Sequence, residues 1–231
     1  MEQDRIDKIL LDLESGYDRM ADKFSETRKF FWPDLAFISD YIESGDNILD
    51  YGCGNGRLLE ILKDKKIDYT GVDVSQKLID LARSGYPAYN FQKISGQAIL
   101  PSKDNYFNKV ISIAVFHHFP KKYAQKTAKE LYRVTKPNGT IIITVWNLWQ
   151  RRHWKYIFSF RILWKKIFQN EGLGFKDIYI PFKNNEGEVF YRYHHAYTKK
   201  DLGKIFQEAG FSVEKCFIAS KKNIVVIAKK K

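Results

Sequence analysis

Three glycines at alternate positions and a later aspartate are the residues whose types and spacing most directly suggest chemistry. Gly52, Gly54 and Gly56 stand in the run DYGCGNG at residues 50–56, directly after a short apolar stretch. Glycine lets a backbone approach a bound nucleoside because it carries no Cβ. Asp73 ends the next apolar stretch, where a carboxylate can accept hydrogen bonds from both hydroxyls of a ribose. Together these residues predict a nucleoside-binding site.

Two other interpretations of the same residues remain open. A dinucleotide site prefers the spacing GxGxxG, with a helix N-terminus facing a pyrophosphate, and here the third glycine comes one residue early. A purely structural role would make the glycines a turn before a helix and Asp73 a cap for the next helix. Because both features stand at strand ends, we favour a nucleoside that carries no phosphate.

A pair of histidines, His117 and His118, directly follows a strand expected over residues 109–115. Open α/β sheets bind ligands at the carboxyl ends of their strands, so this position favours a role in a site over simple packing. Adjacent side chains point in different directions, and we expect one of the two to face a substrate. His194 and His195 form a second pair, but neither pair has a carboxylate at metal-ligand spacing. We therefore expect no metal site.

The elements that must position these residues follow from hydrophobic periodicity and turn signals. Helices are expected within residues 3–43 and over residues 58–63, 75–83, 122–134 and 202–209, with Ser75 as an N-cap, a capping box from Thr198 to Asp201, and Gly210 after the last helix. Strands are expected over residues 47–50, 69–72, 91–94, 109–115, 140–146, 211–219 and 223–228. Strands that alternate with helices form a parallel sheet. The sequence predicts an α/β fold, in which a mostly parallel seven-stranded sheet has helices on both faces and an antiparallel C-terminal hairpin.

Length and composition fit one such domain. The chain has 231 residues, of which 44% are hydrophobic and 16% aromatic, and this composition excludes a disordered or low-complexity chain. The longest apolar runs are strand-sized and far short of the roughly 20 residues of a transmembrane helix. The first ten residues are charged and lack the apolar core of a signal peptide, and two cysteines are too few for a disulfide framework. We therefore expect a cytoplasmic protein without a membrane span.

The positive charge is concentrated in the last two-fifths of the chain. Residues 141–231 carry 18 of the 39 Lys and Arg residues but only 7 of the 27 acids. The densest part, residues 151–168, has no acid and places aromatic residues between its six cations, Arg151, Arg152, Lys155, Arg161, Lys165 and Lys166. Cations beside aromatic rings suit phosphates and unstacked bases of RNA. A helix packed on the body of the protein and a helix on an anionic lipid surface are the alternatives.

The chain resembles the class I S-adenosylmethionine-dependent methyltransferases, whose fold is Rossmann-like. The run at residues 50–56 looks like their first motif, Asp73 like their ribose carboxylate, and KPNG at residues 136–139 like the turn before their fifth strand. Where many of them have an acid after the third strand, this chain has Gln97, whose amide can still contact adenine. The resemblance implies S-adenosyl-L-methionine as the cofactor, bound by Tyr17, Asp50, Gly52, Gly54, Gly56, Asp73, Val74, Gln97 and Ala114.

A closer resemblance covers almost the whole chain. The blocks YDRMA at residues 17–21, FSETR at 24–28, HH at 117–118 and RYHH at 192–195 look like the tRNA wobble-uridine carboxymethyl methyltransferases. This family includes the methyltransferase half of the AlkB-homologue tRNA enzymes, and its members esterify the carboxylate of 5-carboxymethyluridine. His194 departs from it, standing where an aromatic residue is expected. The resemblance implies the tRNA anticodon loop and a small zinc-binding activator protein as partners.

The implied reaction needs a cation more than a base. A carboxylate with a pKa near 4 is ionised at neutral pH, so it attacks a methyl group once it is aligned. The resemblance and the positive charge point to Arg28, His117, His118, Arg192 and His195 as the residues that hold or orient it, and a guanidinium offers bidentate geometry. For Arg28, an ion pair with a neighbouring acid on a solvated helix is an equal alternative.

Two other classes of function stay open. A methyltransferase of a small carboxylate or quinone-like molecule would leave the basic C-terminal region without a role. A non-catalytic RNA-binding protein is disfavoured by the intact glycine run and Asp73. We expect a single domain over residues 1–231, consisting of a helical cap (1–43), a cofactor-binding core (44–146), a basic and aromatic substrate-binding insertion (147–197), and a final helix and hairpin (198–231).

Overall fold

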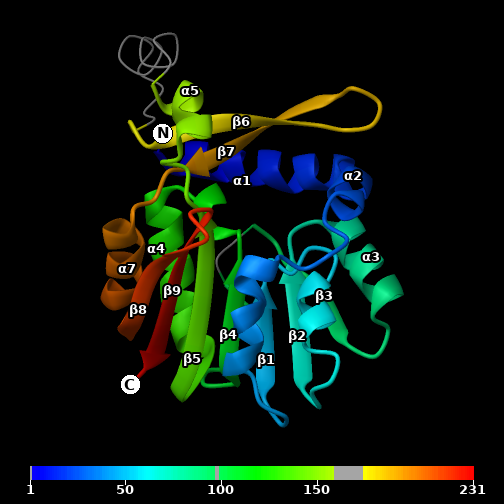
Figure 1. Ribbon diagram of the computed structural model, residues 1–231, viewed down its shortest axis with the longest axis vertical. Helices are drawn as coiled ribbons and strands as arrows, with labels where there is room; N and C mark the ends of the chain where they lie inside the picture. The colour runs from blue at the N-terminus through cyan, green and yellow to red at the C-terminus, as the bar shows by residue number, and fades with distance from the viewer. Residues whose placement is uncertain (1, 97–98, 159–173) are drawn as a thin grey trace.

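The computed structural model describes residues 2–96, 99–158 and 174–231, and its centre is a seven-stranded sheet in the order β3-β2-β1-β4-β5-β9-β8 (Figure 1). Strands β1 to β5 run parallel, whereas β9 runs antiparallel to both β5 and β8. The strands are β1 (Asn47–Tyr51), β2 (Asp68–Asp73), β3 (Asn90–Lys93), β4 (Phe107–Ile113), β5 (Thr135–Trp146), β8 (Phe211–Ala219) and β9 (Asn223–Lys230). The predicted fold class, including the antiparallel C-terminal hairpin, is confirmed.

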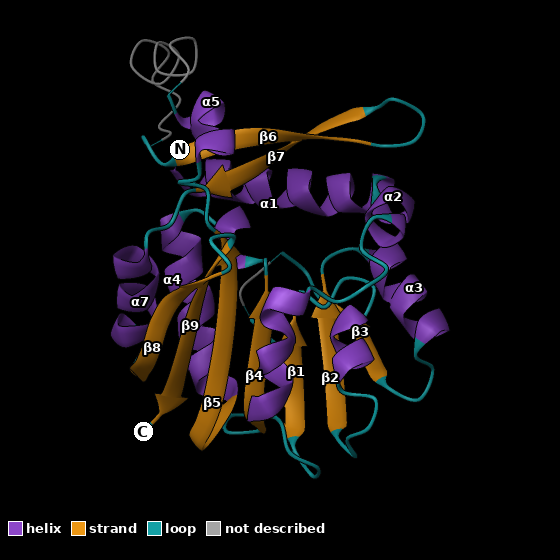
Figure 2. Ribbon diagram, viewed as in Figure 1, coloured by secondary structure: helices purple, strands orange, loops and turns teal. Residues whose placement is uncertain are grey.

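Helices cover both faces of this sheet (Figure 2). Helices α4 and α7 pack on one face around Val110 and Ile141, while α3 and two 3₁₀ helices, η1 and η2, pack on the other around Ile111 and Ile142. Successive residues of a strand point to opposite faces, so apolar runs in β4 and β5 supply both cores. The helices are α1 (Glu2–Arg19), α2 (Ala21–Glu26), η1 (Pro33–Tyr41), η2 (Arg57–Ile61), α3 (Gln76–Gly85), η3 (Phe116–His118), α4 (Lys121–Val134), η4 (Arg151–His153), α5 (Trp154–Ile157) and α7 (Lys199–Glu208).

The segments η1 and η2 are 3₁₀ helices where helical periodicity alone favoured α-helices. Side chains from neighbouring segments hold both of them in place. Glu60 of η2 accepts a hydrogen bond from the Phe31 N–H (2.6 Å), and Lys65 Nζ donates to the carbonyls of Ser39 and Ile42 at the end of η1. Carbonyl groups at a helix end need such partners, and here tertiary contacts supply them.

A second, two-stranded sheet, which the sequence did not predict, lies over the carboxyl ends of the parallel strands. Strands β6 (Asp177–Lys183) and β7 (Val189–His195) form an antiparallel hairpin that runs alongside α1 (Figure 1). Ile9 and Leu13 of α1 pack against Phe190 and Tyr193 of β7. Helix α1 and the hairpin therefore form a roof above the sheet edge at which ligands bind in α/β folds.

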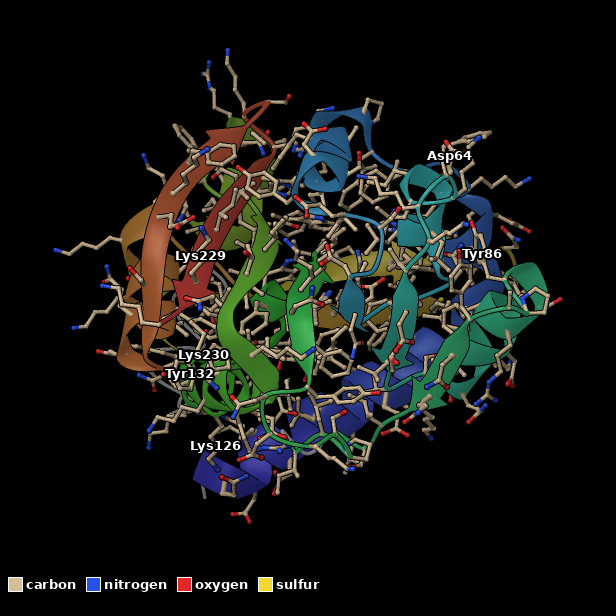
Figure 3. The ribbon with its side chains drawn as sticks, turned by 90° about the horizontal axis from the view of Figure 1, so that it is seen from below. Asp64, Tyr86, Lys126, Tyr132, Lys229 and Lys230 are labelled. Carbon is tan, nitrogen blue, oxygen red and sulfur yellow. The ribbon has the colours of Figure 1, made fainter. Side chains whose placement is uncertain are left out.

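The expected caps are present at both ends of the fold. Ser75 caps α3 by accepting a hydrogen bond from the Leu78 N–H, and Thr198 and Asp201 form the capping box of α7. The end of β9 is tied to α4, because Lys230 Nζ donates to the Tyr132 carbonyl (2.6 Å); Figure 3 shows the two side chains together. Among the helices in the described ranges, none combines the length and the apolarity that a membrane crossing requires.

Candidate active site

One pocket opens between the roof and the carboxyl ends of β1, β2 and β4. Its empty volume, open mouth included, is about 1080 Å³. The predicted site residues that line it are Tyr17, Arg28, Asp50, Gly52, Gly54, Asp73, Val74, Ala114, His117, His118 and Arg192. Gly56 and His195 do not line it, and Gln97 lies outside the described residues. The structure thus gathers residues from the N-terminal helices, three strand ends and β7 around one space.

The glycine run forms the floor of one end of the pocket. Gly54 has a left-handed φ of +56°, and a Cβ built on it would point toward Phe24, 3.2 Å from the ring and inside the pocket. Gly56 also has a positive φ, +78°, but a Cβ there would meet Tyr86 and Phe91 behind the pocket. A side chain on Gly54 would therefore crowd the Phe24 ring inside the pocket, whereas one on Gly56 would crowd the rings behind it.

Asp73 lies where β2 ends and faces this floor. One carboxylate oxygen accepts a hydrogen bond from the Gly54 N–H (2.9 Å) and the other from the Ser75 N–H (3.0 Å). Burial raises the pKa of Asp73, and the backbone hydrogen bonds oppose that rise. A carboxylate fixed in this way at a strand end has the position and the acceptor atoms that a ribose requires.

Asp50 lies beside it at the end of β1 and is only 2% exposed. Its carboxylate accepts a hydrogen bond from the Tyr69 hydroxyl (2.7 Å). Burial, partly opposed by that hydrogen bond and reinforced by the nearby Asp73, raises the pKa of Asp50 to about 7. A buried acid of this kind favours a cation as its neighbour, because the cation would stabilise the ionised form.

Two guanidinium groups lie near one aromatic ring, Phe182, on the wall of the pocket formed by β6 and β7. The Arg28 guanidinium lies 5.4 Å from the centre of the Phe182 ring and that of Arg192 lies 4.6 Å from it. Arg192 is 4% exposed and also lies over Trp146 (5.5 Å), and its Nε finds no hydrogen-bond partner in the described part of the chain. Burial and the charge of Arg192 lower the pKa of Arg28. No acid of the described residues forms an ion pair with either guanidinium, and two neighbouring cations of this kind favour an anionic ligand.

The two predicted histidines are buried and neutral, so the expectation that they would add positive charge is wrong. His118 Nδ1 bonds the Tyr193 carbonyl (2.9 Å) and its Nε2 bonds the Tyr17 hydroxyl (2.7 Å). Burial, aided by the charge of Arg192, lowers the pKa of His118 to about 3. Burial likewise lowers the pKa of His117 far below its usual value. The physical reason is desolvation, which disfavours an imidazolium next to a guanidinium.

The tautomer of His117 follows from its backbone partner. The Trp146 N–H donates to His117 Nδ1 (3.3 Å), so the proton of the neutral ring resides on Nε2. His194 stacks parallel to His117, with ring centres 5.1 Å apart, and brings a third imidazole to the cluster. Ring nitrogens of His117, His118 and His194 lie within 4.8 Å of one another. A protonated Nε2 has no lone pair for a metal ion and Arg192 repels cations, so we still expect no metal here.

His195 lies outside the pocket, on the far side of β7. Its Nδ1 pairs with the Asp177 carboxylate of β6 (2.6 Å), which also accepts a hydrogen bond from the Tyr193 hydroxyl (2.6 Å). These bonds lower the pKa of Asp177 against the effect of burial. His195 therefore joins the two strands of the hairpin and does not meet the ligand space.

Arg57 is the charged residue of the pocket lining that the sequence patterns did not point to. It directly follows Gly56, its guanidinium lies 4.1 Å from the centre of the Trp32 ring, and it lines the pocket beside Asp50 and Gly54. The available signal was a cation immediately after the glycine run, at the start of η2.

The described part of the basic segment lies on the surface near the roof. Arg151, Arg152 and Lys155 are exposed, as are the rings of Trp154 and Phe158, whereas Ile157 is buried. The segment begins with short helices, η4 and α5, and its other three cations, Arg161, Lys165 and Lys166, lie outside the described residues.

Comparison with known proteins gives one family and several relatives. Residues 19–215 match the family model described as a methyltransferase domain. A tRNA (carboxymethyluridine(34)-5-O)-methyltransferase of Arabidopsis thaliana is 37% identical over 132 residues, which cover 56% of this chain and 31% of that protein. A Schizosaccharomyces pombe protein of the same name is 26% identical over 85% of this chain and 87% of its own. The chain thus spans about a third of the Arabidopsis protein, and only 20% of the mouse relative, which bears the same name.

Solved structures share the fold. An S-adenosylmethionine-dependent methyltransferase from Methanosarcina mazei superposes with a TM-score of 0.69 at 21% identity. The superposition covers 87% of this chain and 98% of the Methanosarcina chain. A putative methyltransferase from Haloferax volcanii, solved in complex with the Trm112 methyltransferase activator, superposes with a TM-score of 0.64 at 18% identity. The superposition covers 94% of this chain and 96% of the Haloferax chain.

Proposed function

This chain belongs to the methyltransferase-domain family, and we propose that it esterifies, with S-adenosylmethionine as methyl donor, the carboxylate of a 5-carboxymethyl-type uridine at the wobble position of tRNA. The observation that carries the proposal is the pair of guanidiniums of Arg28 and Arg192 around Phe182, in the same pocket as the glycine run and Asp73. The names of the relatives from Arabidopsis thaliana and Schizosaccharomyces pombe support the choice of substrate.

The floor of the pocket fits S-adenosylmethionine. Gly52 and Gly54 bring bare backbone to the pocket lining for the nucleoside, and Asp73 offers carboxylate oxygens to the ribose. The buried acid Asp50, whose pKa of about 7 favours a cationic neighbour, suits a positively charged ligand. When bound, the cofactor supplies a methyl group activated by a sulfonium. Val74, Ala114 and Tyr17 line the same space and complete the proposed cofactor site.

Arg28 and Arg192 hold the carboxylate of the substrate in this proposal. A guanidinium binds both oxygens of a carboxylate, and the free Nε of Arg192 is a buried donor that a ligand oxygen would satisfy. The carboxylate is already ionised at neutral pH, so the site needs no general base, and catalysis rests on alignment of the oxygen with the methyl group.

The neutral histidines orient and enclose the substrate. His117 presents an Nε2–H to the cluster, fixed as a donor by the Trp146 N–H, and His118 fixes the Tyr17 hydroxyl at the boundary between the two ends of the pocket. Because these groups lie within aromatic surroundings, they exclude water from the carboxylate and strengthen its interaction with the arginines. His195 acts on the site only through the hairpin.

Contact with tRNA runs through the basic segment. Arg151, Arg152 and Lys155 would meet phosphates, and the exposed rings of Trp154 and Phe158 would stack on unpaired bases. We include Arg161, Lys165 and Lys166, which lie outside the described residues, among the cations proposed to contact phosphates. An activator subunit, of the kind solved with the Haloferax volcanii protein, is a further partner to be supplied in assays.

The test is transfer of a labelled methyl group from S-adenosylmethionine to tRNA that carries 5-carboxymethyluridine, with and without an activator, followed by mass spectrometry of the nucleosides. We expect the methyl ester to appear only with the modified tRNA, and to be lost in Arg192→Ala. Methylation of the free nucleoside as fast as of the tRNA would favour the small-carboxylate alternative. Failure to methylate either, by a protein that binds the cofactor, would contradict the proposed substrate.

A further inference from the structure

A third arginine, Arg57, lines the pocket beside the glycine run with one guanidinium nitrogen that no described residue satisfies. Its Nη1 is buried and makes no hydrogen bond with any described residue. Stacking on Trp32, at 4.1 Å from the ring centre, fixes the guanidinium plane. A buried donor on a cation is costly to leave unsatisfied, so the site is built for an anionic ligand.

The charges around Arg57 support this conclusion. Burial and the nearby Arg28 lower the pKa of Arg57 to about 10, which leaves the side chain a cation at neutral pH. Of the two acids close enough to influence it, Asp50 accepts the Tyr69 hydroxyl and Glu60 accepts the Phe31 N–H. Each carboxylate accepts that hydrogen bond on one oxygen, and both act on the Arg57 guanidinium through their charge and not through a hydrogen bond.

The order of the cations along the pocket assigns their ligands. Arg57 directly follows the glycine run. Arg28 lies between the other two arginines: its guanidinium is 4.3 Å from the centre of the Phe24 ring beside Gly54, and its charge acts on Arg57 and is acted on by Arg192. The proposed reaction brings two carboxylates into this space, one on the substrate and one on the methionine part of the cofactor. Of the three arginines that line the pocket, Arg57 is the one whose charge acts on Asp50, the acid suited to a cationic group of the cofactor.

We infer that Arg57 binds the α-carboxylate of the methionine part of S-adenosylmethionine, which leaves Arg28 and Arg192 for the carboxylate of the substrate. The inference rests on the proposed function for its ligand. It makes Arg57 a cofactor-binding residue that distinguishes ligands with an amino-acid part from those without one.

The experiment compares two ligands by calorimetry, S-adenosylhomocysteine and 5′-methylthioadenosine, which share the nucleoside but differ in the amino-acid part. In Arg57→Gln, affinity for S-adenosylhomocysteine should fall about 10- to 100-fold, as expected for loss of a charge-assisted hydrogen bond, while affinity for 5′-methylthioadenosine stays within about twofold. In Arg28→Gln the ratio of the two affinities should stay close to that of the wild type. Thermal unfolding without ligand confirms that both variants are folded.

The outcomes separate this inference from the proposed function. The assignment of Arg57 is overturned if Arg57→Gln weakens the affinity for both ligands equally, or if Arg28→Gln instead selectively weakens the affinity for S-adenosylhomocysteine. Either result leaves the proposed tRNA substrate unaffected. A selective loss in Arg57→Gln by a protein that methylates no tRNA supports the assignment and removes the substrate proposal. Wild-type protein that binds neither ligand overturns both.

Discussion

Among single residues, Asp50 carries a free-energy cost in the empty pocket that the cofactor would remove. Its pKa of about 7 stands far above the ordinary value of 3.8. Between these two pH values the folded chain keeps a proton that the unfolded chain has lost, so the free energy of unfolding falls as the pH rises through this range. The ionised carboxylate is least favourable above pH 7, where a bound cation would compensate for it.

Asp50→Asn should therefore separate stability from binding. At pH 8 and without cofactor, we expect the variant to unfold at a higher temperature than the wild type, because its amide can accept the Tyr69 hydrogen bond without a buried charge. At pH 5 the two should unfold at similar temperatures, and at pH 8 the variant should bind S-adenosylmethionine more weakly. Thermal unfolding and calorimetry measure both, with Asp80→Asn on the exposed face of α3 as the control. A variant less stable than the wild type at pH 8 would contradict the raised pKa.

Arg192→Lys tests bidentate binding of the substrate carboxylate. We expect the rate at saturating cofactor to fall by at least about tenfold although the charge is kept, since an ammonium cannot hold both oxygens in one plane. For the wild type the same rate should be nearly constant between about pH 6 and 8.5. His118, with a pKa of about 3, stays neutral throughout that range, as does His117. Steady-state assays between about pH 6 and 8.5 measure this rate. A rate that rises about tenfold per pH unit would mean that the nucleophile must first lose a proton.

Some residues of the site could be predicted from the sequence, and others could not. Asp73 and Gly54 could be placed in the pocket from the sequence because their positions follow from the chain itself, at a strand end and in a turn. Arg57 was missed because its role depends on Trp32, a contact between segments that no local pattern encodes. The charge of His117 and His118 was predicted wrongly for a similar reason, since burial beside Arg192 is a property of the folded chain.

At the scale of elements, the sheet could be predicted and its roof could not. The parallel strands are apolar runs buried on both faces, and such runs are visible in the sequence. In the first half of β7 exposed and buried side chains alternate, with Val189 and Tyr191 exposed and Phe190 buried, so the strand shows no continuous apolar run. The strand also lies within the basic part of the chain, which was interpreted from its charge. The hairpin also depends on α1, more than 150 residues away in the chain, for the surface on which it packs.

Asp177→Ala tests whether the hairpin positions the substrate site. The carboxylate of Asp177 joins His195 and Tyr193, so its loss should loosen β7 and with it the guanidinium of Arg192. We expect a higher KM for tRNA and a lower rate, while the affinity for S-adenosylhomocysteine stays within about twofold. Kinetics with tRNA and calorimetry with S-adenosylhomocysteine provide the two measurements, with Asp177→Asn as the milder partner. Equal weakening of both would show that the hairpin supports the whole pocket.

For the whole molecule, the uneven charge predicts how tRNA binds. If the six cations of residues 151–168 each meet a phosphate, the logarithm of affinity for a single-stranded loop should fall against the logarithm of salt with a slope of about −4. Changing Arg151, Arg152, Lys165 and Lys166 to Glu should abolish tRNA binding and leave cofactor binding intact. Filter binding at several salt concentrations measures the slope. If this variant keeps its affinity for tRNA, the tRNA interface lies elsewhere. If it instead loses binding to liposomes, the segment binds a lipid surface.

The position of β9 at the end of the chain determines when the sheet can be completed during synthesis. Residues Asn223–Lys230 pair with β5 on one side and β8 on the other, so β9 joins two parts of the sheet although it follows both in the chain. As the nascent chain leaves the ribosome, β1 to β5 emerge together and can pair early. The free edge of β5 then stays open while the roof hairpin, α7 and β8 are translated, and an open edge is a template for pairing with another chain. Translation speed across residues 147–222 therefore sets how long each new molecule is exposed to aggregation before its own β9 closes the sheet.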